Sequence, residues 1–207
     1  MEPVKPRGLI KHIPNALTVA RLIMALVFLG MILYAGDLPD PKPADLLMTA
    51  FALFVIAGLT DIVDGWVARA WNATSRFGRT VDPLADKFLV CGAFICFAIV
   101  GRPLLYHFHF PAWLDDTIRW GAAVVLFSRE VVVQTLRHIA ESRGVNFGAV
   151  VSGKIKMFLQ SFGIGTVLIG WSFVSRAWGD WFTLITYILM VAFTIYSGIE
   201  SLRRPIK

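Results

Sequence analysis

The sequence predicts an all-α integral membrane protein, and three observations support this fold class. Hydrophobic residues make up 57% of the 207 residues, against about 45–50% in soluble proteins, and the mean hydropathy is +0.66. The apolar residues gather in six runs, each near the length of about 20 residues that crosses a bilayer as a helix. Basic residues concentrate in alternate connecting segments, as in multi-pass membrane proteins.

The six predicted transmembrane helices are separated by short segments that contain glycine, proline and charged residues. They cover residues 16–34, 46–67, 84–100, 118–139, 157–174 and 181–202. We predict a single membrane domain over residues 1–207. It consists of a short juxtamembrane segment, residues 1–15, which Pro14 would interrupt as a helix, and a six-helix core, residues 16–202.

The distribution of charge predicts the orientation of these helices. Six spans place both ends of the chain on one side of the membrane. That side receives most of the basic residues outside the spans, whereas the other side receives Lys42, Arg102, Arg119 and Arg176. Because cytoplasmic loops are enriched in Lys and Arg, we expect both termini in the cytoplasm and the protein in the cell (inner) membrane. The net charge of +6 then comes from basic cytoplasmic loops that contact anionic lipids. No nucleic-acid partner is predicted.

Four aspartates lie at the cytoplasmic ends of the second and third predicted helices. Asp61 and Asp64 would be about 60° apart around a helix, and Asp82 and Asp86 about 40° apart. A turn between residues 70 and 79 would bring the two pairs together. Clustered carboxylates repel one another unless cations lie between them, so we predict Mg²⁺ or Mn²⁺, with two ions, at this site. The alternative is a solvated loop in which the acids pair with nearby basic residues, and four acids at matched helical spacings disfavour it.

The complete pattern is D-x2-D-G-x2-A-R-x8-G-x3-D-x3-D over residues 61–86. It resembles the signature of the CDP-alcohol phosphotransferase family, and the likeness extends over nearly all of the chain, because that family has six membrane helices and a cytoplasmic-side active site. The resemblance implies that an alcohol attacks a CDP-activated lipid and releases CMP, and it implies a homodimer. It also implies that Asp61, Asp64, Asp82 and Asp86 bind metal, and that Asp86 is the catalytic base. The CDP-lipid would be bound by Asp61, Asp64, Gly65, Ala68, Arg69, Ser75 and Gly78.

A polar stripe opens the first predicted helix. Asn15, Thr18 and Arg21 recur every three residues in an otherwise apolar run. We interpret them as a wall of the CDP-lipid site. The alternative is a helix N-cap followed by an arginine whose side chain extends to the membrane surface.

Four basic residues at the fourth and fifth predicted helices are candidates for binding a phosphate on the acceptor alcohol: Arg129, Arg137, Lys154 and Lys156. Arg129 lies within an apolar run, where an unpaired charge is costly. Glu130 follows it directly, so it would point about 100° away on a helix. We therefore expect Glu130 to be a poor partner for Arg129 and to make another contact. For Lys154 and Lys156, the alternative is the ordinary enrichment of lysine in cytoplasmic loops.

The Arg129-Glu130 and Leu136-Arg137 pairs, followed by G-K-x-K-x3-Q at residues 153–160, resemble the phosphatidylglycerophosphate synthases within the family. This resemblance implies CDP-diacylglycerol and the small phosphorylated alcohol sn-glycerol 3-phosphate as substrates. Many of those synthases have threonine where this chain has Met157. Inositol phosphate, or phosphatidylglycerol as in cardiolipin synthases, therefore stays open as the acceptor.

Two other classes of membrane protein also contain clustered acids. A transporter would show broken helices and inverted repeats near the midplane, neither of which is visible here. Intramembrane prenyltransferases use aspartates with Mg²⁺ and a diphosphate, but their motifs lack the D-G-x2-A-R continuation. Release of CMP from a CDP-lipid would separate the proposed class from both.

Overall fold

The computed structural model describes residues 13–39, 42–70, 76–144, 151–173 and 176–203. Side chains are described for all of these except residues 13–15, 61–70, 76–86 and 151. This part of the chain contains α-helices and one 3-10 turn, and no strand. The helices are α1 (Ile13–Asp37), α2 (Ala44–Ala70), α3 (Arg76–Ile99), α4 (Ala112–Ser142), α5 (Val151–Phe173) and α6 (Ala177–Leu202), with the turn η2 (Tyr106–Phe108) before α4. The prediction of an all-α protein built from six helices is confirmed.

Every helix begins before the first residue of the predicted transmembrane helix. Helix α3 begins at Arg76 and α4 at Ala112, whereas the corresponding apolar runs begin only at residues 84 and 118. Apolar runs mark the part of a helix that suits a hydrocarbon environment, whereas the backbone hydrogen bonds continue through polar residues at the ends. Pro14 does not interrupt α1, because it occupies the first turn, where its missing N–H removes no intrahelical bond. Residues 1–12 lie outside the described part.

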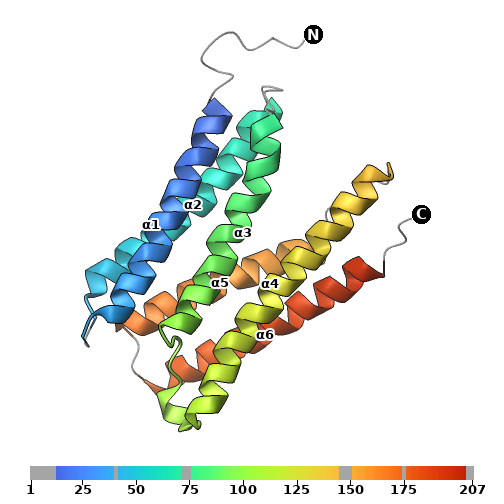
Figure 1. Ribbon diagram of the computed structural model, residues 1–207. Helices are drawn as coiled ribbons and strands as arrows, with labels where there is room; N and C mark the ends of the chain where they lie inside the picture. Colours follow the sequence, from blue (N-terminus) through green and yellow to red (C-terminus); the bar gives the residue numbers. More distant parts are fainter. Residues whose placement is uncertain (1–12, 40–41, 71–75, 145–150, 174–175, 204–207) are drawn as a thin grey trace. The chain divides into compact units, whose positions relative to one another are not determined.

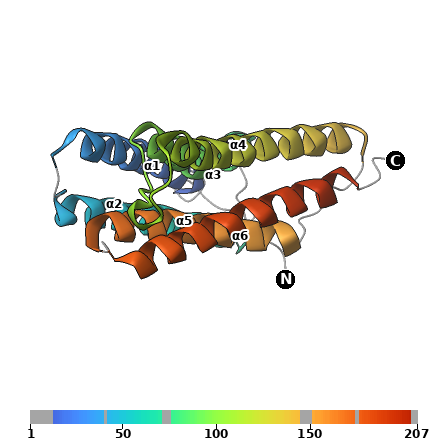
Figure 2. The same cartoon turned by 90° about the horizontal axis from the view of Figure 1, so that it is seen from below.

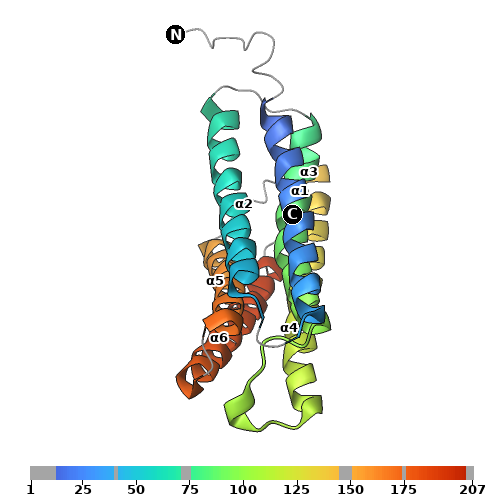
Figure 3. The same ribbon diagram turned by 90° about the vertical axis from the view of Figure 1, so that its left-hand side faces the viewer.

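The chain divides into two compact units, Met1–Ala93 and Phe94–Lys207. In the first unit α1 packs along α2 (Figures 1 and 3). Every third or fourth residue of α1 is buried, and α2 has the same pattern, with Phe28 of α1 and Phe54 of α2 at a ring-centroid distance of 5.4 Å. Helix α3 approaches α1 closely at Gly92, where an added Cβ would lie 2.7 Å from Leu29 Cδ1.

In the second unit α6 contacts both α5 and α4 (Figures 1 and 2). Its core includes Phe94, at the end of α3, which meets the Tyr187 ring of α6 edge to face at 5.9 Å. Gly144, two residues after the end of helix α4, is in the left-handed region at φ +73°, and its N–H donates to the Glu141 carbonyl. Glycine is the residue that adopts this conformation without steric cost.

The outer faces of the helices are also apolar. Exposed large side chains include Ile23 and Leu26 on α1, Phe158 on α5 and Ile188 on α6. Two helices, at Ala16–Asp37 and Ala177–Leu202, are long and apolar enough to cross a membrane, and shorter apolar stretches occur at Ala44–Thr60 and Lys87–Ile99. Helices that are apolar on every side are typical of buried or membrane environments, which suggests a membrane protein.

Candidate active site

The acidic motif falls on two helices, as the sequence predicts. Asp61 and Asp64 belong to the last turns of α2, and Asp82 and Asp86 to the first turns of α3. Helix α2 ends at Ala70 and α3 already begins at Arg76, so the segment that separates the two helices is shorter than the predicted one, residues 70–79. The side chains of the motif, and Ser75 altogether, lie outside the described residues, so their mutual geometry stays a prediction.

The donor set fits a hard divalent cation on chemical grounds. Both pairs of aspartates lie in continuous helices, at spacings of three and four residues, so each pair occupies one helix face. Carboxylate oxygens are the ligands that Mg²⁺ and Mn²⁺ prefer. Among the side chains that the structure does describe, no group of three His, Cys, Asp or Glu residues is placed to hold a metal ion.

Two residues of the polar stripe of α1, Thr18 and Arg21, face inward. Thr18 and Arg21 are each only 1% exposed, so the Arg21 side chain does not extend to the protein surface. This burial contradicts the part of the alternative in which Arg21 extends to the surface, whereas the N-cap part of it is not tested. A fully buried guanidinium requires acceptors or anions around it, which is consistent with a site that binds an anionic substrate. Asn15 lies in the first turn of α1, and its side chain is outside the described residues.

The candidate acceptor residues do not behave as one group. Arg129 of α4 and Lys156 of α5 meet at Glu130, whose Oε1 accepts a hydrogen bond from Arg129 Nη1 at 3.1 Å and another from the Lys156 ammonium group. Lys156 is 3% exposed, whereas Lys154 is exposed. Arg137 is partly buried, and its buried Nε has no hydrogen-bond partner among the described residues. The structure thus brings Arg129 and Lys156 together.

The expectation that Glu130 is a poor partner for Arg129 is wrong. The angle of about 100° between adjacent residues applies to the Cα–Cβ directions, and the long arginine side chain bends back to reach the neighbouring carboxylate. The other part of that expectation, a further contact for Glu130, is confirmed by its ion pair with Lys156.

Helix α6 contributes polar residues that the sequence reasoning missed. Ser197 Oγ lies 2.6 Å from Arg129 Nη2, and Thr194 Oγ1 lies 3.4 Å from Gln160 Nε2. Both α6 residues are fully buried. The available signal was the recurrence of Thr194, Ser197 and Ser201 every three or four residues in an apolar helix, which places them on one face.

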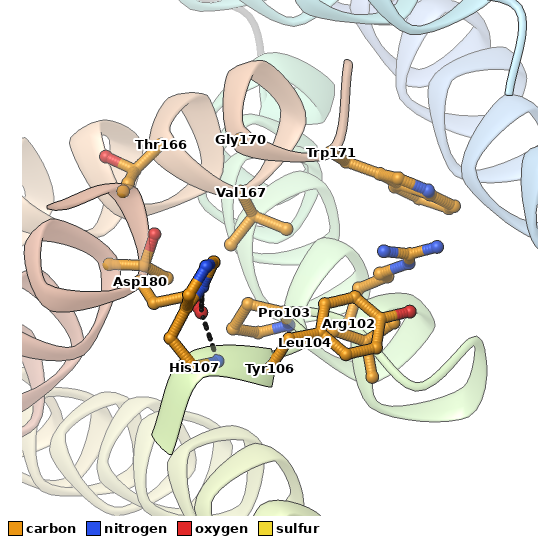
Figure 4. Close-up of a pocket in the computed structure, with 12 residues that line it drawn as sticks. Arg102, Pro103, Leu104, Tyr106, His107, Thr166, Val167, Gly170, Trp171 and Asp180 are labelled. Atoms are coloured by element: carbon orange, nitrogen blue, oxygen red, sulfur yellow. Dashed lines mark hydrogen bonds and ion pairs between the residues drawn. The ribbon is translucent and has the colours of Figure 1, made fainter. Parts of the chain in front are cut away.

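The described part of the second unit also has a cavity of about 210 Å³ at the opposite end of α5 (Figure 4). The Arg102 guanidinium lies 4.7 Å from the centre of the Trp171 ring. Asp180 Oδ2 accepts the backbone N–H of His107 at 2.9 Å and lies 2.8 Å from His107 Nδ1. Since Trp171 is 15 residues beyond Lys156, this cavity is about 20 Å along the helix from the Arg129–Lys156 pair. The Asp180 contacts tie the segment before α4 to α6.

Comparison with known proteins identifies the family. Residues 11–196 match the CDP-alcohol phosphatidyltransferase family. The chain belongs to this family. It is similar to the CDP-diacylglycerol–glycerol-3-phosphate 3-phosphatidyltransferase of Bacillus subtilis (strain 168), with 31% identity over 91% of this chain and 92% of that protein. The enzyme of the same name from Mycoplasma genitalium is 33% identical over 91% of this chain and 81% of its own length. A probable phosphatidylglycerophosphate synthase of Mycobacterium tuberculosis is 28% identical, covering 97% and 85%.

Family membership makes the protein a phosphatidyltransferase, which confirms the enzyme class predicted from residues 61–86. The matched region includes the acidic motif, the α1 stripe, and both Arg129 and Lys156. The aspartates of α2 and α3, in the first unit, and Arg129 and Lys156, in the second, remain the residues predicted to bind the substrates and metal.

Proposed function

We propose that this protein transfers a phosphatidyl group from CDP-diacylglycerol to sn-glycerol 3-phosphate and releases CMP. The observation that supports this acceptor is the pair of Arg129, which is partly buried, and Lys156, which is buried, because two cations at one position suit a phosphate dianion. The relatives from Bacillus subtilis and Mycoplasma genitalium have names that state the same donor and acceptor.

In the proposed reaction the acceptor hydroxyl oxygen attacks the β-phosphorus of the CDP-lipid, and the bond from that phosphorus to the CMP oxygen breaks. Asp86 takes the hydroxyl proton. Arg69 donates to the diphosphate through its planar guanidinium, and the α1 stripe forms one wall of this binding site. Two Mg²⁺ or Mn²⁺ ions held by Asp61, Asp64, Asp82 and Asp86 would neutralise the charge of the diphosphate and of the departing CMP.

We further propose that all six helices cross the cell (inner) membrane as one domain, with both termini and the active site in the cytoplasm. The apolar outer faces of the helices support membrane insertion, and the excess of basic residues on one side supports the orientation. We also propose a homodimer, as the family resemblance implies.

The test is an acceptor screen with purified protein, CDP-diacylglycerol and Mg²⁺ or Mn²⁺, in which CMP release is measured for a panel of alcohols. We expect turnover with sn-glycerol 3-phosphate, its loss with excess chelator and its return with added metal. Turnover with only inositol phosphate or phosphatidylglycerol would refute the acceptor and leave the family unchanged. Full turnover in excess chelator, after metal removal is verified, would refute the metal site.

A further inference from the structure

Glu130 occupies the point where α4, α5 and α6 meet. The residue is only 8% exposed. A single carboxylate oxygen, Oε1, forms ion pairs with both the Arg129 guanidinium and the Lys156 ammonium group. Arg129 continues across to α6, where it bonds Ser197. Glu130 therefore links a basic residue of α4, Arg129, to one of α5, Lys156. Helix α6 contacts Arg129 through Ser197.

The Arg129 side chain is restricted on its α6 side as well. An added Cβ at Gly198 would lie 3.3 Å from Arg129 Cγ, so the glycine leaves the room that this side chain occupies. The guanidinium is thus held by Glu130 on one side and by Ser197 on the other. Its Nε is buried and has no hydrogen-bond partner among the described residues. A buried donor of this kind requires an acceptor oxygen, and a phosphate oxygen is a suitable one.

Electrostatics explains why a carboxylate is needed at this position. Two cations that share one small buried region repel each other strongly, because the effective dielectric constant is low there. Burial of an ammonium group such as that of Lys156 is costly unless an anion accompanies it. Glu130 meets both requirements and leaves the three side chains with one net positive charge. A phosphate dianion would then meet two cations that are already in place, and would not have to order them itself.

We propose that Glu130 is a positioning residue for the acceptor site, which holds Arg129 and Lys156 together so that they bind the phosphate of the acceptor alcohol. The ligand class is a phosphate monoester dianion. The proposal rests on the proposed function, because it assumes that the acceptor carries a phosphate. Glu130 acts through the two cations and does not itself contact the reacting atoms.

A purely structural role would have different consequences. If Glu130 only stabilises the packing of α4 against α5, its loss lowers the melting temperature and affects both substrates alike. If it positions the two cations, its loss changes the apparent KM for the phosphorylated acceptor and leaves that for the CDP-lipid nearly unchanged. The two roles therefore separate in a comparison of the two KM values.

The experiment uses the full-length protein and CMP release, with each substrate titrated in turn. Glu130→Gln keeps the shape of the side chain and removes its charge. We expect it to raise the KM for sn-glycerol 3-phosphate about 10-fold or more, as for the loss of one charge-assisted contact, and to change the KM for CDP-diacylglycerol by less than about 2-fold. Glu130→Asp retains the charge and should recover part of the acceptor affinity.

Two further variants serve as controls. Asp180→Asn removes another buried carboxylate of the same unit, at the other end of α6, and should lower the melting temperature without a selective effect on the acceptor KM. Lys156→Met combined with Glu130→Gln should raise that KM by less than the product of the two single effects, because residues that act as one unit are not additive; the remaining effect of Glu130→Gln then reflects Arg129 alone.

Equal increases in both KM values, or full additivity of the double variant, would overturn the positioning role. An unchanged acceptor KM in Glu130→Gln, with normal wild-type turnover of sn-glycerol 3-phosphate, would overturn the positioning role alone. If the wild type uses a different phosphorylated alcohol, the proposed acceptor fails and the same titrations are made with that alcohol. An acceptor without a phosphate monoester would overturn both proposals.

Discussion

Lys154 and Lys156 offer a matched pair of substitutions in one turn of α5. Two residues along a helix correspond to a rotation of about 200°, so the two side chains leave opposite sides of the helix. Lys156 is buried against Glu130, whereas Lys154 is exposed. We predict that Lys156→Met strongly raises the KM for sn-glycerol 3-phosphate, and that Lys154→Met does not.

The expected magnitudes follow from these environments. A hydrogen bond to a charged group contributes about 1.5–3 kcal/mol, which corresponds to a KM increase of about 10- to 150-fold for Lys156→Met. An exposed charge contributes about 0–1 kcal/mol, which corresponds to no more than about 5-fold for Lys154→Met. Methionine is unbranched and apolar, so it fills the space of the lysine stem and limits cavity effects.

Initial rates of CMP release, with each substrate varied at saturating levels of the other, measure the two KM values. The melting temperature of each variant, measured in the same detergent, controls for loss of folding. The reasoning would be refuted by similar acceptor KM values for the two variants. It would also be refuted if Lys156→Met raised the KM for CDP-diacylglycerol as much as that for the acceptor, because Lys156 would then support the fold or the diphosphate site.

Three further predictions concern other parts of the molecule. Asp86→Asn should retain measurable binding of the CDP-lipid while turnover falls about 10²–10⁴-fold, the usual range for a general base; near-normal turnover would exclude Asp86 as the base. Gly92→Ala should lower the melting temperature, because the added methyl meets Leu29 of α1 at 2.7 Å, with a cost of about 1–3 kcal/mol for overpacking. The control is Gly30→Ala, where no atom lies within 4 Å, and an equal effect of the two would contradict the close packing. Burial raises the pKa of the Asp115 carboxyl in the folded protein, so the unfolded chain loses this proton at a lower pH. The free energy of unfolding therefore falls as pH rises from the ordinary aspartate pKa of the unfolded chain to the raised pKa of the folded one. Asp115→Asn should therefore raise the melting temperature at neutral and alkaline pH, and the gain should vanish below the ordinary pKa of an aspartate; a gain that is independent of pH would exclude this cause.

The sequence by itself determined the features that depend on local spacing. The six helices follow from apolar runs of sufficient length, because a backbone in an apolar environment must satisfy its hydrogen bonds within the helix. The placement of Asp61 and Asp64 on one helix, and of Asp82 and Asp86 on the next, follows from their spacing within segments of predictable type. The family could be predicted for the same reason, since its signature lies within 26 consecutive residues.

The tertiary structure decided which of the basic residues belong together. Lys154 and Lys156 have the same chemistry and nearly the same position in the sequence, and only the packing of α5 shows that Lys156 is the buried one. The contact from Lys156 to Glu130 spans 26 residues, and that from Arg129 to Ser197 spans 68. Such contacts depend on how helices pack, which the periodicity of one helix does not specify. The Arg129–Glu130 contact departs from the helical angle for a related reason: a long side chain goes where its charge is best compensated, and the surrounding helices determine that place.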